Sequence, residues 1–405
     1  MGASDAPPEH AARLLACPDY ARYDFGPRHP LNPRRYDASL DLLRRAGLLH
    51  DSDTVCPPPA TVAELELVHT AQYVEALARL SDWAPLTEAP LEAEARRYGL
   101  GVGDNPVFPG AHEAAALVVG GSVHVARTLC TPGASGEVRH FFHPMGGLHH
   151  GMPARASGFC LYNDPAVAIA AVVQERQARV LYIDLDVHHG DGVQQTFEDD
   201  PRVMTVSFHE SGAHLFPGTG DVLELGRGAG RGTAVNVPLA PGTDDESYVA
   251  ALEAVLPPLA EGFRPDVIMS QHGCDTHVWD PLADLQLTTR ALEHAARLVH
   301  RLAHELCDGR WLAWGGGGYD LYRVVPRHWA LLWAEMAGRA VPMRLPDDWR
   351  LRWEAEAGVS LPETFRDSAD GVASVAAARA AEANRNTVQR VRRLLLPASQ
   401  RLSKP

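Results

Sequence analysis

The chain has 405 residues, 45% of them hydrophobic, which is enough for a packed core in one large α/β domain or two smaller ones. Its 37 Lys and Arg against 51 Asp and Glu give a net charge of −14, which argues against a nucleic-acid-binding protein. The sequence has no signal-peptide pattern and no apolar run of about 20 residues, so we expect a cytoplasmic protein without a membrane anchor. Its six cysteines are scattered, and we expect all of them to be reduced thiols.

Four short apolar runs predict strands, and each is followed by a loop rich in glycine and reactive side chains. In chain order these are strand 138–143 with loop 146–151, strand 180–183 with loop 184–191, strand 266–270 with loop 271–275, and strand 311–314 with loop 315–319. Helical patterns lie between them at 165–174, 244–260 and 287–306. Strands alternating with helices predict a parallel sheet covered on both faces. Because ligands bind beyond the carboxyl ends of such strands, we expect all four loops to meet at one site.

The first loop contains two adjacent histidines, His149 and His150, after a pair of glycines. A bare His-His dipeptide is most often a surface feature. At the edge of a site, however, either imidazole is a candidate general base or acid near neutral pH. Each would need an acceptor to orient it, and Asp184 and Asp191 of the second loop can supply these partners.

The second loop, Asp-Leu-Asp-Val-His-His-Gly-Asp at 184–191, holds three carboxylates and two imidazoles. Such charge is costly to bury unless a cation or a reaction uses it, although a solvated turn is the alternative. Asp186 and His188 are two residues apart, so their side chains point to the same side of an extended segment. Asp275 of the third loop is the best third ligand, with a helix N-cap as its alternative role. This ligand set suits a divalent metal and fits zinc and ferrous iron alike.

The fourth loop runs through four glycines into Tyr319. Consecutive glycines lose much conformational entropy on folding, so we expect that the backbone geometry here requires glycine. The possible reasons are a phosphate-binding loop, close approach of a substrate, or a flexible hinge. The Lys and Ser or Thr of a phosphate loop are missing. Tyr319 can donate a hydrogen bond to a developing oxyanion, or it is a packed core residue. Phe159 and Phe216, in glycine-containing loops, are ordinary core residues or the walls of a slot for an aliphatic chain.

The last segment, residues 366–405, is rich in Ala and Arg and places Val388, Val391 and Leu395 at helical spacing. We therefore expect a single domain over residues 1–365 and a helical tail after it. The tail is either a terminal helix on the domain or a docking arm for a partner.

In their order and spacing, these motifs resemble the zinc-dependent, class I-type histone deacetylase family, and within it the bacterial acetoin-utilisation deacetylases. The similarity runs from about residue 20 to residue 335 and includes, besides the four loops, segments 29–35, 98–101, 157–160 and 216–220. The resemblance implies the arginase/deacetylase fold, a three-layer α/β/α domain with a largely parallel eight-stranded sheet.

The resemblance also implies a role for each matching residue. Asp186, His188 and Asp275 would hold the metal. The catalytic set would comprise His150 as main general base and acid, His149 as its electrostatic partner, Asp191 and Asp184 as their respective orienting carboxylates, and Tyr319 polarising the acetyl carbonyl. The substrate set would comprise Asp104 holding the substrate backbone, Gly158 accepting from the amide, Phe159 and Phe216 walling the channel, and Arg35 lining an acetate-exit cavity. Family members also hold potassium, one ion through the segment Asp184–His188 and Ser207.

The function implied is metal-dependent hydrolysis of Nε-acetyl-lysine in a protein, and the subgroup suggests acetylated acetyl-CoA synthetase as a partner. Small N-acetylated amines such as acetylpolyamines are the alternative substrates. Leu282 stands where polyamine-selective relatives tend to carry an acidic residue, which favours acetyl-lysine. An arginase-like two-metal site would need more bridging carboxylates, and a binding module without catalysis would have no use for Tyr319 and His150. The sequence leaves the oligomeric state open.

Overall fold

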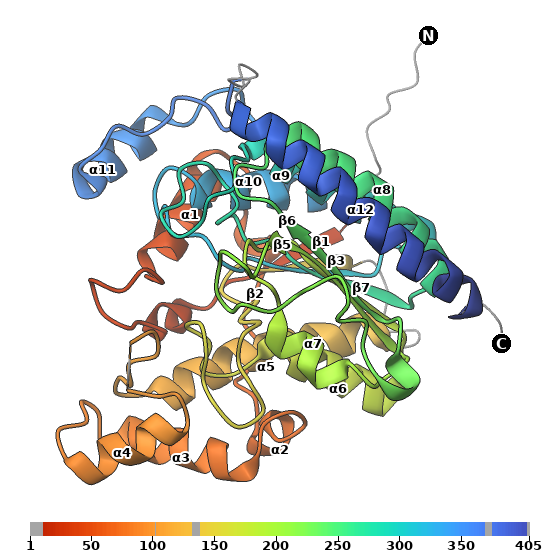
Figure 1. Ribbon diagram of the computed structural model, residues 1–405. Coiled ribbons are helices and arrows are strands. Elements are labelled where there is room, and N and C mark those ends of the chain that lie inside the picture. The colour runs from red at the N-terminus through yellow and green to blue at the C-terminus, as the bar shows by residue number, and fades with distance from the viewer. Residues whose placement is uncertain (1–10, 102, 132–137, 369–374, 403–405) are drawn as a thin grey trace.

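The computed structural model describes residues 11–101, 103–131, 138–368 and 375–402 (Figure 1). Its centre is an eight-stranded sheet in the order β2-β1-β3-β8-β7-β4-β5-β6, in which every pair of neighbouring strands is parallel. The strands are β1 (Ala11–Leu15), β2 (Thr54–Val55), β3 (Val138–His143), β4 (Val180–Asp184), β5 (Val203–Glu210), β6 (Ala234–Leu239), β7 (Val267–Gln271) and β8 (Trp311–Trp314).

Helices cover both faces of the sheet, which gives the three-layer α/β/α arrangement (Figure 1). One layer contains α2 (Val62–Leu65), α3 (Ala71–Asp82), α4 (Ala89–Arg97), α5 (Ala111–Cys130), α6 (Asp164–Arg176) and α7 (Asp191–Phe197). The other contains α1 (Arg34–Arg45), α8 (Asp245–Phe263), α9 (Thr289–Cys307), α10 (Val325–Met336), α11 (Asp347–Ala357) and α12 (Val375–Leu402). In the described part of the chain, no helix combines the length and apolar character needed to cross a bilayer.

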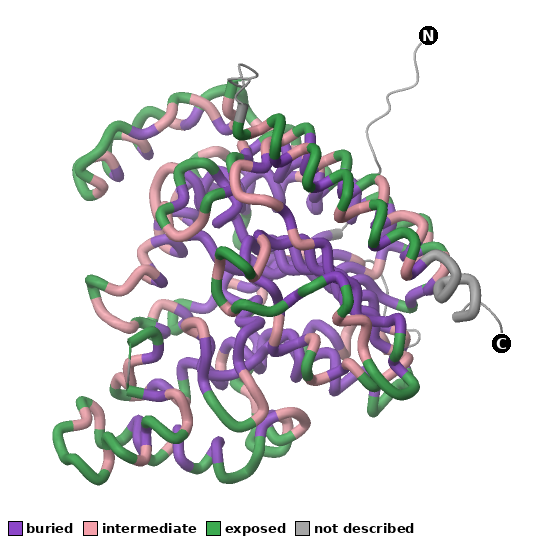
Figure 2. Tube along the Cα trace, in the orientation of Figure 1, coloured by how far each residue is buried: buried purple, intermediate pink, exposed green. Residues whose placement is uncertain are grey.

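The four strands predicted from the sequence are confirmed as β3, β4, β7 and β8, and they lie side by side in the order β3-β8-β7-β4. Every residue of β4, β7 and β8 is buried, because helices cover both faces; this explains why they are continuous apolar runs (Figure 2). The predicted helical patterns correspond to α6, α8 and α9. The four reactive loops therefore leave one continuous edge of the sheet.

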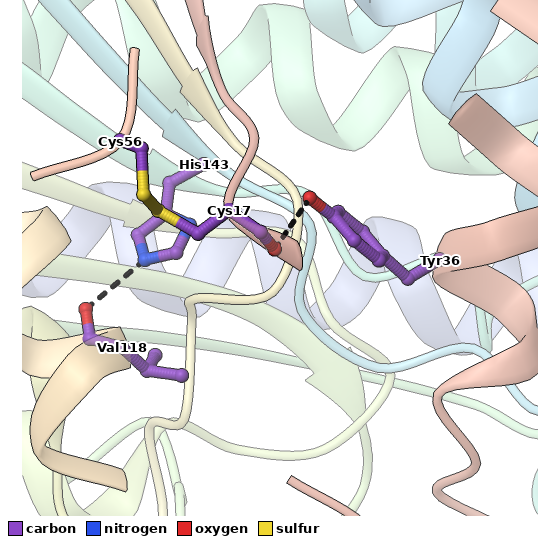
Figure 3. The surroundings of a disulfide bond; sticks show 5 residues. All are labelled: Cys17, Tyr36, Cys56, Val118 and His143. Carbon is purple, nitrogen blue, oxygen red and sulfur yellow. Dashed lines mark hydrogen bonds between the residues drawn. A yellow bond between two sulfur atoms is a disulfide. The ribbon is translucent and has the colours of Figure 1, made fainter. Parts of the chain in front are cut away.

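Cys17 and Cys56 form a disulfide, so the prediction that all six cysteines are reduced is wrong for these two (Figure 3). They are 39 residues apart in sequence and meet only because β1 and β2 pair with Leu15 opposite Val55. No local spacing signals that contact. Cys130, Cys160, Cys274 and Cys307 are free thiols.

Helix α12 lies along α8 and also contacts β6 (Figures 1 and 2). The side chain of Asn384 is buried in this contact. It accepts a hydrogen bond from the Ala240 N–H at 2.9 Å and donates to Thr243 Oγ1 at 2.8 Å and Ser247 Oγ at 2.9 Å. The helix is therefore joined by polar as well as apolar contacts to the edge strand of the sheet and the helix beside it.

Candidate metal centre and active site

Asp186, His188 and Asp275 converge at the carboxyl ends of β4 and β7. His188 Nδ1 lies 3.0 Å from Asp186 Oδ1 and 3.2 Å from Asp275 Oδ2. One ligand atom from each residue lies within 4.8 Å of the other two, and all three side chains are buried. The sequence predicted these three residues as a group, and the fold brings them together from loops almost 90 residues apart.

Each carboxylate has one oxygen held by residues outside the cluster and one directed toward His188, whose backbone N–H also donates to Asp186 Oδ1 at 3.0 Å. Asp186 Oδ2 accepts from Gln271 Nε2 at 2.6 Å and from the Gly317 N–H at 2.8 Å. Asp275 Oδ1 accepts from the Val187 N–H at 2.9 Å. Asp186 Oδ1 and Asp275 Oδ2 are thus left facing His188 Nδ1. Two oxygens and one imidazole nitrogen around a common point form a three-ligand set with an open coordination position.

The charges of this cluster fit a cation. Burial, and then repulsion from Asp186, raises the pKa of Asp275 to about 7. For His188, burial opposes protonation, but its hydrogen bonds to Asp186 and Asp275 outweigh burial and raise its pKa to about 10. The proton on His188 Nδ1 therefore occupies the position in which a metal ion would neutralise the negative charge of the two carboxylates. Neutralising two buried carboxylates is what a divalent ion accomplishes, so the residues fit zinc or ferrous iron.

Two glycines allow the backbone to approach the carboxylates closely. A Cβ on Gly317 would lie 2.2 Å from Asp275 Oδ2 and 2.6 Å from Asp186 Oδ2, and one on Gly273 would lie 2.3 Å from Asp186 Oδ2. All three distances are shorter than van der Waals contact allows. The glycine-rich fourth loop therefore meets a demand for close approach to the site.

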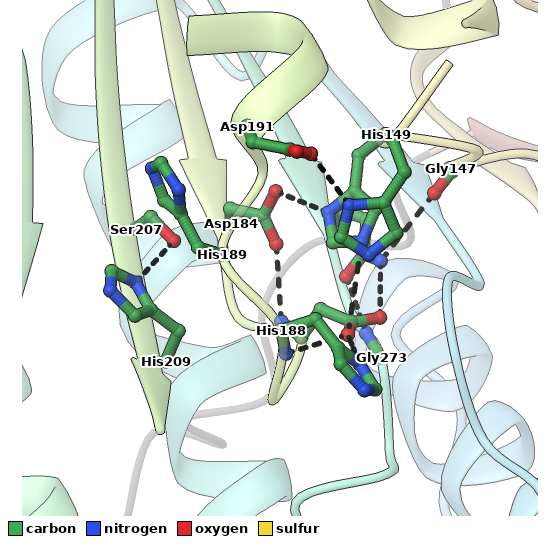
Figure 4. Close-up of polar contacts among 12 residues, drawn as sticks. Gly147, His149, Asp184, His188, His189, Asp191, Ser207, His209 and Gly273 are labelled. Carbon is green, nitrogen blue, oxygen red and sulfur yellow. Dashed lines mark hydrogen bonds and ion pairs between the residues drawn. The ribbon is translucent and has the colours of Figure 1, made fainter. Parts of the chain in front are cut away.

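His149 and His150 lie next to this cluster, and each is oriented by its own carboxylate. Figure 4 shows His149 with Asp184 and Asp191 close to it. His149 Nδ1 donates to Asp184 Oδ2 at 2.7 Å, and His150 Nδ1 donates to Asp191 Oδ1 at 2.7 Å. The two ring centroids are 4.0 Å apart. His149 Nε2 lies 3.9 Å from Asp186 Oδ1, so this nitrogen faces the candidate metal centre.

The two imidazoles differ in their affinity for a proton. For His149, burial lowers the pKa, but the charges of Asp184 and Asp186 outweigh it and raise the pKa to about 9. For His150, burial and the charge of His149 lower the pKa to about 4 against the opposing effect of Asp191. A charged His149 therefore lies beside a neutral His150 at pH 7, and the neutral ring can accept a proton.

Tyr319 and Phe159 form one wall beside the cluster. Their ring centroids are 5.6 Å apart in an edge-to-face arrangement. The Tyr319 N–H donates to Asp280 Oδ2 at 2.7 Å, and this hydrogen bond fixes the backbone at Tyr319. Burial, followed by the negative charges of Asp275 and Asp186, raises the pKa of the Tyr319 hydroxyl well above its usual range. The hydroxyl therefore remains protonated and able to donate.

Phe216 lies on the His150 side of the site, with its ring centroid 5.0 Å from that of His150, and 43% of the residue is exposed. Gly158 approaches the same imidazole, since a Cβ there would lie 2.4 Å from His150 Cδ2. Phe159 and Phe216 thus pack against different candidate catalytic residues. The exposure of Phe216 indicates that this side of the site is open to solvent.

Three other predicted residues lie around the site at different depths. Arg35 is buried and donates through Nη1 to the carbonyls of Gly316 at 2.9 Å and Gly318 at 3.2 Å. Leu282 is half-buried, and its N–H donates to Asp280 Oδ1 at 3.0 Å. Asp104 is exposed and contacts none of the cluster side chains directly. Its carbonyl accepts from His29 Nε2 at 3.2 Å, and the His29 ring packs on Phe159 at 4.6 Å.

Sequence reasoning missed three buried polar residues that hold the site in place. Gln271, the last residue of β7, orients Asp186. Asp164, the first residue of α6, accepts the N–H groups of Gly147 at 3.0 Å and Leu148 at 2.8 Å and so fixes the loop before the histidines. Asp280 links Tyr319 to Leu282. A polar residue ending an apolar strand, an acid in a helix first turn, and an Asp-Pro pair after Asp275 are the signals that could have revealed them.

Comparisons with known proteins agree with this geometry. The family model of the histone deacetylase domain matches residues 29–336. The acetoin utilization protein AcuC of Bacillus subtilis (strain 168) is 45% identical over 357 residues, 88% of this chain and 90% of that protein. AcuC of Staphylococcus aureus (strain Mu50 / ATCC 700699) is 41% identical over 309 residues, 76% of this chain and 77% of that protein. The crystal structure of an HDAC homolog from Aquifex aeolicus, 30% identical, matches with a TM-score of 0.81 and covers 94% of this chain and 99% of its own.

Proposed function

Because the chain belongs to the histone deacetylase family, in the AcuC subgroup, and is a deacetylase, we propose that it hydrolyses the Nε-acetyl amide of lysine in an acetylated protein. The observation that carries this proposal is the convergence of the Asp186–His188–Asp275 cluster with two carboxylate-paired histidines at one sheet edge. Amide hydrolysis needs an activated water, a proton acceptor that later becomes a donor, and stabilisation of an oxyanion. The residues gathered here can meet all three needs.

The metal centre supplies the electrophile in this proposal. A zinc ion held by Asp186, His188 and Asp275 would polarise the acetyl carbonyl and lower the pKa of the attacking water. The residues Gln271 and Gly317 keep the ligand oxygens aimed at the centre. Ferrous iron suits the same ligands, and metal analysis of the native protein would separate the two.

The proton is moved by His150. Its Nε2 accepts the proton of the attacking water while Nδ1 stays hydrogen-bonded to Asp191, and the resulting charge on the ring is stabilised by that carboxylate. His150 then delivers the proton to the amine as the C–N bond breaks. His149, held by Asp184, stays charged and keeps the pKa of His150 low, which makes the second transfer favourable. Tyr319 donates a hydrogen bond to the carbonyl oxygen as its negative charge develops.

The lysine side chain would enter between Phe159 and Phe216, whose rings flank His150 and Tyr319. Aromatic walls suit the apolar stem of an acetylated lysine. Asp104, exposed above His29 and Phe159, would hold the substrate backbone, and Gly158 would accept from the substrate amide. Arg35 lies buried behind the glycine loop, where its charge would attract the acetate product.

Comparing kcat/KM for an acetyl-lysine peptide with that for acetylspermidine tests the substrate class. We expect the peptide to be preferred. Leu282→Glu should shift the preference toward the cationic amine by charge attraction, and Leu282→Gln, which adds no charge, should not. A wild-type preference for acetylspermidine would establish the small-amine alternative instead.

Three finer expectations belong to the same proposal. Acetylated acetyl-CoA synthetase is the protein substrate suggested by the subgroup. Incubating it with the enzyme and following the loss of its acetyl group by mass spectrometry tests this expectation.

Potassium would bind near Asp184 and Ser207, which are register partners in β4 and β5. A cytoplasmic location stays a prediction. The Cys17–Cys56 disulfide bears on this location, since cytosolic thiols are usually kept reduced. Alkylating the thiols at cell lysis and then counting the alkylated cysteines would show whether the disulfide forms in the cell.

A further inference from the structure

We propose that His140, His300 and His304 form a second metal site, which binds a divalent transition-metal ion such as zinc. His300 and His304 are one turn apart on α9, so they lie on the same face of the helix, and His140 lies in β3. His304 Nε2 lies 3.1 Å from His140 Nε2 and 3.1 Å from His300 Nε2. Three imidazoles with the same nitrogen directed at a common point form a ligand set that zinc, nickel and copper favour.

The outer nitrogens of two of these rings are already engaged as donors. His140 Nδ1 lies 2.9 Å from the Met336 carbonyl, which can only accept, so Nδ1 carries the proton and Nε2 presents a lone pair. His300 Nδ1 donates in the same way to Glu335 Oε1 at 2.8 Å. Backbone carbonyls and carboxylates holding the distal N–H of a histidine are the usual outer partners of metal-bound imidazoles. Both partners come from the last turn of α10: Met336 offers a backbone carbonyl, which has no helical donor at this position, and Glu335 offers its side-chain carboxylate.

The spacing of the nitrogens fits a small ion. With metal–nitrogen bonds of about 2.0–2.1 Å at tetrahedral angles, ligand nitrogens lie roughly 3.3 Å apart. The two separations from His304 Nε2, both 3.1 Å, need only a slight expansion, and the three ligand atoms all lie within 4.8 Å of one another. The ring centroids form a nearly equilateral triangle with sides of 4.7, 5.1 and 4.9 Å, as expected for rings arranged around one point.

The site is accessible and separate from the candidate active site. His140 and His300 are buried, whereas His304 is exposed, so an ion can enter from solvent and keep a water ligand. His140 pairs in register with Trp311, the first residue of β8, while the reactive loops follow the last residues of β3 and β8. The histidine cluster therefore lies toward the opposite end of these strands. An ion there would join α9 to β3 and would not touch the substrate.

Zinc stoichiometry after removal of metal by a chelator and reloading with Zn²⁺ tests the proposal. The wild type should bind two zinc ions per chain, and His304→Gln should bind one while keeping its deacetylase activity. Because His304 is exposed, this variant should fold, and circular dichroism would verify it. His294→Gln is the matched control, because His294 is on the same helix but pairs with Glu253 outside the cluster. It should still bind two ions.

Asp186→Ala should lose the ion of the active site and keep the other, which distinguishes the two centres. The retained ion can be replaced with Co²⁺, whose visible absorption should disappear when His304→Gln is added. Trp311 stacks on His300 with ring centroids 5.5 Å apart, so Cu²⁺ in this site should quench tryptophan fluorescence in Asp186→Ala protein. One zinc ion per wild-type chain, or two in the His304→Gln variant, would overturn the proposal.

Discussion

Gln271 orients Asp186: its Nε2 donates to Asp186 Oδ2 at 2.6 Å, and its Oε1 accepts the Gly273 N–H at 2.7 Å. The second contact fixes which end of the amide faces the carboxylate. A neutral side chain at the end of β7 thus sets the direction of a buried acid in the loop after β4. The other oxygen of Asp186, Oδ1, accepts the His188 N–H at 3.0 Å and faces the candidate metal centre.

Replacing Gln271 with leucine should therefore weaken metal binding without removing a ligand. We expect about 10- to 100-fold lower zinc affinity, since loss of an outer hydrogen bond typically costs that much. Competition with a fluorescent chelator measures the affinity, and activity should return at saturating zinc. Gln286→Leu, at an exposed position, is the control. Equal zinc affinity in the Gln271 variant and the wild type would show that Gln271 does not orient a ligand.

Tyr319→Phe should lower kcat by about 10²- to 10³-fold, because the donor to the developing oxyanion is lost. Zinc content and Tm should not change, since the phenyl ring keeps its packing on Phe159. Tyr322→Phe is a close control: Tyr322 is three residues away, and its hydroxyl bonds to Glu356 at the surface. If Tyr319→Phe turned over substrate at the wild-type rate, the hydroxyl would have no part in the reaction.

The pH profile of kcat/KM should be bell-shaped. Activity requires neutral His150, whose pKa is near 4, so the rate rises as pH rises through that value. It also requires charged His149, whose pKa is near 9, so the rate falls as pH rises through it. A metal ion bound at the candidate centre would repel the protons on His149 and His150 and lower the pKa of both. In the metal-bound enzyme, both limbs of the profile should therefore lie at lower pH than these values.

The variant His149→Gln separates the two limbs of this profile. Loss of the positive charge raises the pKa of His150, so the acid limb should move to higher pH, and the alkaline limb should disappear. A slower variant with an unaltered profile would contradict the assignment of the two limbs.

Asp367→Asn should destabilise the fold by about 3–5 kcal/mol, because it leaves a buried guanidinium unpaired. Asp367 accepts from Arg327 Nη1 at 2.7 Å, His277 Nε2 at 2.9 Å and the Thr289 N–H at 2.9 Å, and the Arg327 side chain is fully buried. Urea unfolding at pH 7 measures the loss. Asp347→Asn, at a side chain that is 81% exposed, should cost little.

The stabilities of the wild type and of the Asp367→Asn variant should become similar at acid pH. Burial raises the pKa of Asp367, but the hydrogen bond from His277 and the charge of Arg327 outweigh burial and depress it. The stability from this carboxylate is therefore complete above its ordinary pKa of 3.8 and is lost as pH falls toward the depressed value. The stability difference between wild type and Asp367→Asn should shrink below that pH. A constant difference would rule out the charge as its source.

The sequence was informative where a strand ends in reactive side chains. The runs before Asp184, Asp275 and Tyr319 are buried along their whole length, so they are largely apolar segments that can be recognised without a structure. The run before His149 is buried over its last four residues. The common edge of parallel strands then predicts that their loops meet. Which strands are neighbours did not follow from the sequence, because β8 inserts between β3 and β7.

Other parts of the fold gave no such signal. Strand β1 is Ala-Ala-Arg-Leu-Leu, a composition typical of helices, and α5 is buried around most of its circumference, which removes the amphipathic period. Asp280 and Asp164 act through backbone N–H groups of distant loops. The Cys17–Cys56 disulfide depends on which strands pair. Each of these features is set by tertiary neighbours that sequence spacing does not reveal.

Helix α12 has a consequence for how the chain matures. Strand β6 is an outermost strand of the sheet, and the helix that covers it and α8 follows every other described helix and strand in the chain. Until residues 375–402 leave the ribosome, the Ala240 N–H has no Asn384 to accept it, and the apolar surface beside it stays open to other chains. Nascent or prematurely terminated polypeptides should therefore aggregate through this margin even when the catalytic half has already assembled.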